Sequence, residues 1–168
     1  MKILIVSDSH GRTDLLCGIS SQERPDMIIH LGDLEDDRKL VEKKLGAPEI
    51  PCVFIKGNCD YGSNGDLLNT SVFNLKGHRF FCTHGHLYSV NYSTDRLLYT
   101  AEENNCDIVI YGHTHRPCNE WSDAAPGRPL INILNPGSIA FPRGSNSRTY
   151  MIMELKDDGA YEVELKTL

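Results

Sequence analysis

The chain has 168 residues, of which 40% are hydrophobic and 24% are charged, a composition that excludes a disordered or fibrous protein. Its formal net charge of -6 argues against a protein that binds nucleic acid mainly through a basic surface, so we expect no stable nucleic-acid partner. The apolar runs are far shorter than the ~20 residues that a membrane-spanning helix needs, and we expect no membrane contact.

The length suits one hydrophobic core, and no linker, repeat or low-complexity tract divides the sequence. We therefore expect residues 1–168 to form a single domain. The 6 cysteines include no Cys-x-x-Cys pair, which argues against a thiolate zinc site or a thioredoxin-type motif. Several of them lie in or beside apolar runs, as buried reduced thiols do, and this favours a cytoplasmic location.

The first part of the sequence alternates apolar, β-branched runs with segments of helical periodicity. Strands are predicted at residues 2–7, 27–31 and 52–56. Helices are predicted between them, from about residue 12 to 21 and from about residue 35 to 45, where Gly46 ends the helical pattern. Continuous apolar strands are typical of a sheet that is buried on both faces, so the chain opens as a βαβαβ unit.

The second part is richer in strands. Two hairpins are predicted, the first from residues 71–75 and 79–83 and the second from residues 150–155 and 160–165, with an Asp-Gly turn in the second. Between them we predict a helix from Ser93 or Thr94 to about residue 104, and strands at residues 107–111 and 130–134. Residues 123–129 and 135–143 are expected to be loops.

Short segments that contain possible metal ligands follow these strands. They are Asp8-Ser9-His10, Gly32-Asp33, Gly57-Asn58-Cys59-Asp60, Thr83-His84-Gly85-His86 and Gly112-His113-Thr114-His115. Because such loops can meet along one edge of the sheets, all of them could line one crevice. Carboxylate, amide and imidazole ligands without thiolate suit a pair of divalent ions of the manganese, iron or zinc type, which predicts a two-metal hydrolytic site.

Taken one at a time, the segments also have structural interpretations. Asp8 and Asp33 could cap turns or helices, and Asn58 could be a turn residue. His113 and His115, which alternate in a glycine turn after a buried strand, have few structural uses. Asp33 suits a bridging position, because one carboxylate can offer an oxygen to each of two ions. The role of His86 stays open between a group behind the ligands, a substrate contact and a surface residue.

The order Asp-x-His, Gly-Asp, Gly-Asn, His and Gly-His-x-His resembles the calcineurin-like metallophosphoesterase superfamily. With the additional segment Asn135-Pro136-Gly137-Ser138, the chain resembles the small single-domain prokaryotic phosphodiesterase branch of that superfamily. The resemblance covers nearly the whole chain. It implies an α/β fold in which two mixed β-sheets are flanked by helices as a four-layer αββα sandwich.

The resemblance also implies how a metal pair is held. Residues that match Asp8, His10, Asp33 and His115 hold one ion, and residues that match Asp33, Asn58, His84 and His113 hold the other. A hydroxide shared by the two ions attacks phosphorus in line, and Asp33, Asn58 and His84 are the expected catalytic residues. Manganese is the expected metal, with iron, zinc and nickel as alternatives.

One position departs from the pattern of many relatives, which carry a histidine after Gly-Asn that protonates the leaving group. This chain has Cys59 there, for which we expect a packing role rather than a role as an acid. Weak protonation would favour substrates with good leaving groups. Arg12, Arg116 and Arg143 lie beside the predicted site loops and could hold a phosphate oxygen. Gly137 and Ser138 are expected to shape the crevice through their backbone.

These observations predict a metal-dependent phosphodiesterase that acts on a small phosphoester substrate. A phosphomonoesterase or nucleotide pyrophosphatase with the same site is the alternative within the enzyme class, because selectivity lies in the surrounding loops. A protein-binding scaffold of the same fold is a third interpretation, which the complete ligand set disfavours. By family resemblance a homo-oligomer, a dimer or tetramer, is compatible with the sequence, and no sequence feature decides it.

Overall fold

The computed structural model describes residues 1–123, 127–144 and 146–168. The strands of this part of the chain are β1 (Lys2–Val6), β2 (Met27–His30), β3 (Cys52–Phe54), β4 (Thr70–Leu75), β5 (His78–Thr83), β6 (Ile108–Ile110), β7 (Cys118–Trp121), β8 (Asn132–Asn135), β9 (Thr149–Leu155) and β10 (Tyr161–Thr167). The helices are α1 (Thr13–Glu23), α2 (Arg38–Leu45) and α3 (Asp95–Glu103), with short 3₁₀ helices at Gly62–Asn64 and His86–Tyr88. No helix in the described ranges is long and apolar enough to cross a membrane.

The strands form two mixed sheets of five strands each. The first has the order β10-β9-β1-β2-β3, and the second has the order β4-β5-β6-β8-β7. β1, β2 and β3 are parallel to one another, as are β5, β6 and β8, whereas the hairpin strands pair antiparallel. The β1–β2 register aligns Ile3 with Met27 and Ile5 with Ile29, so apolar side chains of neighbouring strands lie side by side.

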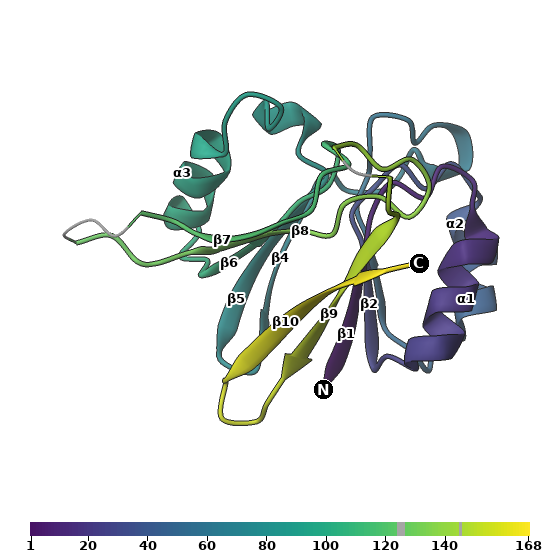
Figure 1. The fold of residues 1–168 in the computed structure, drawn as a ribbon, viewed down its shortest axis with the longest axis horizontal. Helices are drawn as coiled ribbons and strands as arrows, with labels where there is room; N and C mark the ends of the chain where they lie inside the picture. The colour runs from purple at the N-terminus through teal and green to yellow at the C-terminus, as the bar shows by residue number, and fades with distance from the viewer. Residues whose placement is uncertain (124–126, 145) are drawn as a thin grey trace.

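The side chains of the strands alternate between two cores, as the pleat requires. Ile3 and Ile5 of β1 pack in the core between the two sheets, together with Phe80 of β5. Leu4 and Val6 of β1 point the other way, into the core that α1 and α2 cover. A third core lies under α3. Figure 1 shows α1 and α2 on the outer side of one sheet and α3 on the outer side of the other. The predicted four-layer αββα sandwich is thus confirmed.

The second helix was predicted too early in the chain. We expected it to begin near residue 35, but α2 begins after Asp37, whose side chain caps the helix by accepting a hydrogen bond from Leu40 N at 3.2 Å. Glu35 stays in the preceding loop because its amide donates to the Asp60 carboxylate at 3.0 Å. A contact that is distant in the sequence therefore decides where the helical pattern starts.

The edge strand β7 was not predicted. Its residues are mostly exposed, and within the described part of the chain it pairs with β8 alone, so it lacks the apolar run that marks a buried strand. β8 also begins later than the predicted start at residue 130. The predicted loop 135–143 is observed between β8 and β9, whereas part of the predicted loop 123–129 lies outside the described residues.

Candidate metal centre

The segments that contain the predicted ligands meet at one edge of the sandwich. They follow the carboxyl ends of β1, β2, β3, β5 and β6, and backbone hydrogen bonds join them. Asp8 N donates to Gly32 O at 3.0 Å, and Gly112 N donates to His84 O at 3.1 Å. Because the parallel strands of each sheet end at the same side, the two sheets deliver these loops to a common place (Figure 1).

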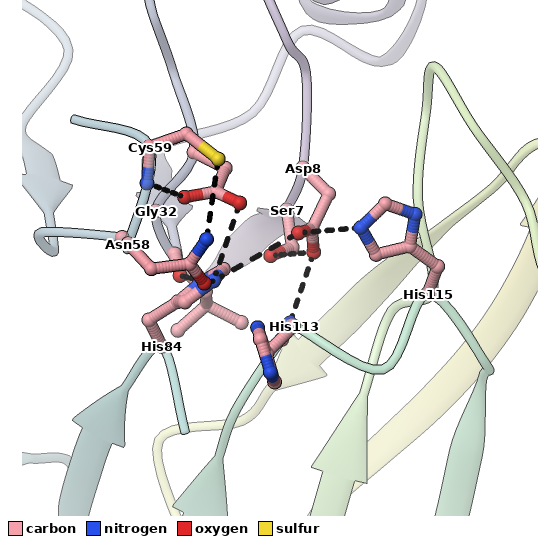
Figure 2. Close-up of polar contacts among 12 residues, drawn as sticks. Ser7, Asp8, Gly32, Asn58, Cys59, His84, His113 and His115 are labelled. Atoms are coloured by element: carbon pink, nitrogen blue, oxygen red, sulfur yellow. Dashed lines mark hydrogen bonds and ion pairs between the residues drawn. The ribbon is translucent and has the colours of Figure 1, made fainter. Parts of the chain in front are cut away.

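Asp8 is the centre of one half of the site. Its side chain is fully buried, and its Oδ1 lies 3.0 Å from His115 Nε2. Its Oδ2 accepts hydrogen bonds from Ser7 Oγ at 2.5 Å and from His113 N at 3.1 Å (Figure 2). The Phe141 carbonyl binds His115 Nδ1, which turns Nε2 of that ring toward Asp8. The loop after β1 is thereby fastened to the loop after β6, across the two sheets.

Asp33 is the centre of the other half. Its Oδ2 lies 3.5 Å from His84 Nε2 and 3.9 Å from His10 Nε2, so it stands between imidazoles that come from different sheets. Its Oδ1 accepts a hydrogen bond from Cys59 N at 2.7 Å. Asn58 Oδ1 lies 3.1 Å from the same His84 Nε2. This central position is the one that a bridging carboxylate requires.

Backbone and carboxylate oxygens orient the rings of the predicted histidine ligands. His84 Nδ1 lies 2.7 Å from Leu31 O, and His10 Nδ1 lies 2.7 Å from Glu35 Oε1. A ring whose Nδ1 donates its hydrogen in this way keeps Nε2 free for a metal ion. His113 differs from these rings, since its Nε2 lies 3.1 Å from the Asn91 amide nitrogen.

The donor arrangement fits metal ions. Asp8, His10 and His115 have ligand atoms within 4.8 Å of one another, as do Asp8, Asp33 and His84. Among the described residues, the buried atoms Asp8 Oδ1 and His10 Nε2 have no hydrogen-bond partner of proper geometry. Burying polar atoms without partners is costly, so their presence in a common cluster indicates a ligand that they bind together.

The backbone of five of the seven predicted ligand residues is also in a costly conformation. Positive φ angles occur at Asp8 (54°), His10 (43°), Asp33 (54°), His113 (66°) and His115 (58°). A non-glycine residue in this left-handed region costs of order 1–3 kcal/mol and persists only where its surroundings enforce it. Its repeated use at the predicted ligands shows that the loops are shaped to aim these side chains at one place.

The electrostatics of the cluster favour a bound cation. Burial alone would raise the pKa of the Asp33 carboxyl, but hydrogen bonding and charge from His84 hold it well below its usual value. Burial likewise opposes ionisation of Asp8, but His115, His84 and Ser7 together outweigh it, so the pKa of Asp8 is also lowered. The carboxylates in turn raise the pKa of His84 and His115 against the effect of burial. Ionised carboxylates that stabilise positive charge on the neighbouring histidines would also stabilise the positive charge of a bound metal ion.

His86 lies beside the predicted ligands and not on the open surface. Its ring centroid is 5.3 Å from that of His84 and 6.1 Å from that of His113. Burial and the neighbouring His84 lower its pKa, so the ring stays neutral. Of the roles left open for His86, this position favours a contact with the predicted ligands or with the substrate over a role as a surface residue.

Cys59 is poorly suited to proton donation. Burial, followed by the charge of Asp33, raises the pKa of its thiol to about 12. A thiol with this pKa is a very weak acid near neutral pH. Cys59 also shares a cluster with His10 and Glu35 in which all ligand atoms lie within 4.8 Å of one another, next to the ion site predicted for His10.

Asp60 was given no role in the sequence analysis, and the structure shows that it holds two of the loops together. Its fully buried carboxylate accepts hydrogen bonds from the amides of Asp33 (2.9 Å), Leu34 (2.9 Å), Glu35 (3.0 Å) and Gly57 (2.8 Å). The loop after β2 is thereby tied to the loop after β3. The only signal in the sequence was an aspartate close behind the Gly-Asn turn.

Asn135 and Ser138 also act through their side chains. Asn135 Nδ2 donates to Gly112 O at 3.0 Å and to Thr114 Oγ1 at 3.1 Å, which braces the turn between His113 and His115. Ser138 Oγ donates to Asp8 O at 2.8 Å. The hydroxyl of Ser138 thus helps to shape the crevice, in addition to the backbone role that was expected of this residue.

Close packing explains the glycines of two predicted motifs. A Cβ at Gly57 would lie 2.1 Å from Asp33 Oδ1, and a Cβ at Gly112 would lie 2.0 Å from Ser7 Oγ. Both glycines therefore allow the backbone to approach a carboxylate-bearing loop without a steric clash.

The cluster of predicted ligands opens into a cavity of about 250 Å³, whose lining includes Asp33, Asn58, His113, His115, Phe141 and Arg143.

An αββα sandwich with paired carboxylate and imidazole clusters at one edge defines the metallophosphoesterase class of protein. A model of the calcineurin-like phosphoesterase superfamily domain matches residues 1–158. The chain therefore belongs to the calcineurin-like phosphoesterase superfamily, as its motifs predicted.

Relatives of similar size support this assignment. The chain is 34% identical over 162 residues to a probable metallophosphoesterase, YsnB, of Bacillus subtilis, with 95% of this chain and 88% of that protein covered. It is 27% identical over 174 residues to the phosphodiesterase YfcE of Escherichia coli, with 92% and 88% covered. A predicted phosphoesterase from Streptococcus pneumoniae has a solved structure that matches with a TM-score of 0.80 and 29% identity, over 99% of this chain and 88% of that one.

Proposed function

We propose that this protein is a metal-dependent phosphodiesterase that acts on small phosphoester substrates. The observation that carries the proposal is the central Asp33 carboxylate, which lies between His10 and His84 and faces a cavity. The name of the relative YfcE supports a diester substrate. Two divalent ions bound here, manganese in our proposal, would neutralise charge on the phosphoryl oxygens and activate water.

The chain's own residues would hold and aim this site. We assign Asp8, His10, Asp33 and His115 to one ion, and Asp33, Asn58, His84 and His113 to the other. The buried carboxylates of Asp8 and Asp33 are kept ionised, and the ring of His84 is oriented by the Leu31 carbonyl. Preorganised ligands of this kind need little rearrangement when the substrate binds.

Leaving-group protonation would be weak, because no histidine stands at the position of Cys59 and the pKa of its thiol is raised to about 12. Aryl esters and other substrates with acidic leaving groups should therefore react fastest. This property would distinguish the protein from relatives that carry a histidine there.

The test compares a chromogenic aryl phosphodiester with the matching monoester, after chelation and after manganese is added back. We expect diester turnover that chelation abolishes, manganese restores and Asp33→Asn removes. Dominant monoester turnover would replace the proposal with a phosphomonoesterase. No turnover of either ester with manganese, iron, zinc or nickel, despite bound metal, would favour a scaffold of the same fold.

A further inference from the structure

A second cavity lies next to the predicted metal centre. Its volume is about 310 Å³, and its lining includes Asn91, Tyr111, Thr114, Pro117, Arg116 and Arg143. Arg143 lines this cavity and the metal cavity alike. A substrate whose reacting phosphate lies at the metal centre could therefore extend into the second cavity past Arg143.

The shared wall of the two cavities is fixed to the ligand loops. Arg143 N donates a hydrogen bond to His115 O at 3.0 Å. Thr114, which lines the second cavity, stands between His113 and His115 in the sequence and accepts a hydrogen bond from Arg116 N at 3.2 Å. These hydrogen bonds hold the backbone of both arginines close to the predicted metal ligands.

The guanidinium groups of Arg116 and Arg143 have no acidic partner and no hydrogen-bond acceptor among the described residues. Arg12, the third arginine near the site loops, is different, because Asp14 binds its Nε at 2.9 Å and its Nη2 at 2.8 Å. On a chain with a net charge of -6, two unpaired arginines in one cavity are a local positive site.

The chemistry of the cavity indicates where an anion would bind. An anion would bind at Arg116 and Arg143, because these are the charged side chains that line the cavity. Guanidinium forks bind phosphate and carboxylate oxygens through paired hydrogen bonds.

We propose that this cavity is a subsite for a second anionic group of the substrate. The preferred substrates would then be small phosphodiesters that carry a second phosphate group besides the reacting one. This inference rests on the proposed function, because it assumes that the reacting phosphate lies at the metal centre. It adds a substrate class, which the metal ligands alone do not specify.

The test measures binding of thymidine 3′,5′-bisphosphate and thymidine 5′-monophosphate to the manganese-loaded full chain by calorimetry. The two ligands differ by a single phosphate. We expect the wild type to bind the bisphosphate about tenfold more tightly, as charge-assisted hydrogen bonds to one phosphate allow. Arg116→Gln with Arg143→Gln should remove most of this preference. Lysine at both positions should restore part of it.

Arg12→Gln is the matched control, and it should keep the full preference because Asp14 already binds that side chain. The inference is overturned if the wild type binds the two ligands equally, or if the double glutamine variant retains the preference. Hydrolysis of the p-nitrophenyl esters of the same two nucleotides separates the two proposals. Retained preference in binding without hydrolysis of either ester would contradict the phosphodiesterase proposal and leave the anion subsite supported.

Discussion

Asp60 shows how a single side chain can organise a site without being one of its predicted ligands. Each of its carboxylate oxygens accepts two backbone amides, from the loops that carry Asp33 and Asn58. The oxygens of both loops therefore keep their relative positions before any metal binds. Residues that position ligands in this way commonly change metal affinity 10–100-fold when they are replaced.

We expect Asp60→Asn to weaken manganese binding by about tenfold or more and to lower the free energy of unfolding by about 2 kcal/mol. The amide nitrogen cannot accept the pair of backbone N–H groups that one carboxylate oxygen accepts now. Calorimetric titration with manganese and urea denaturation measure the two effects. Asp66→Asn is the control, because the Asp66 side chain is 64% exposed. Unchanged manganese affinity in Asp60→Asn would show that the two loops keep their positions without the Asp60 carboxylate.

Cys59→His should accelerate hydrolysis of an alkyl phosphodiester and leave an aryl phosphodiester nearly unaffected. An imidazole can donate a proton near neutral pH, whereas the pKa of the Cys59 thiol is raised to about 12. The readout is the ratio of kcat/KM for the alkyl and aryl substrates, with Cys59→Ser as the control that supplies no comparable acid. If the histidine variant hydrolyses the alkyl diester no faster than the wild type, weak leaving-group protonation is not the reason for substrate preference.

For individual residues, the sequence predicted which side chains gather at the site but not which hydrogen bonds position their loops. His10, His84 and His115 could be inferred because their residue type and spacing carry metal chemistry. The contributions of Asp60 and Ser138 could not, because each consists of hydrogen bonds to backbone groups of loops that are far away in the sequence. Such roles become visible only when the loops are brought together.

At the scale of elements, Glu23 at the end of α1 connects the helix to the first sheet. Its carboxylate binds Lys2 Nζ of β1 at 2.8 Å, Tyr150 Oη of β9 at 2.8 Å and Lys166 Nζ of β10 at 3.1 Å. Burial alone would raise the pKa of Glu23, but these three hydrogen bonds lower it to about 2. The interaction therefore stabilises the packing of α1 on three strands.

Because the folded pKa of Glu23 lies below its unfolded value near 4.5, the stabilisation is complete above that pH and is lost as the pH falls toward 2. We expect Glu23→Gln to lower the free energy of unfolding by about 2 kcal/mol at pH 7, and the difference from wild type to shrink below pH 4.5. Urea denaturation at several pH values measures this, with exposed Glu162→Gln as the control. A difference that does not depend on pH would contradict an ionised Glu23.

The buried strands could be predicted from the sequence more readily than the exposed one. β2 and β6 are buried along their whole length, and β1 is buried except at Lys2; all three were predicted from apolar runs. β7 was missed because an edge strand with exposed residues has no such run, and the start of α2 was displaced by contacts to Asp60. Local pattern therefore predicted the interior elements, whereas tertiary contacts set the boundaries near the site.

At the scale of the whole molecule, the predicted metal centre lies where the two sheets meet. Asp8 follows β1 of the first sheet, and His84 and His115 follow β5 and β6 of the second. Ions held between them would cross-link the two halves of the sandwich. Ligands that bind only the folded state stabilise it by about 2.7 kcal/mol at a hundredfold excess over Kd, so manganese should raise the Tm and chelation should lower it.

Counting manganese per chain by equilibrium dialysis and elemental analysis directly tests the proposed dinuclear centre that Asp33 bridges. We expect two ions per wild-type chain, and no more than one tightly bound ion in Asp33→Asn, with folding of the variant checked by circular dichroism. Asp66→Asn should retain both ions. A single ion in the wild type, or two ions bound with unchanged affinity in Asp33→Asn, would contradict this proposal.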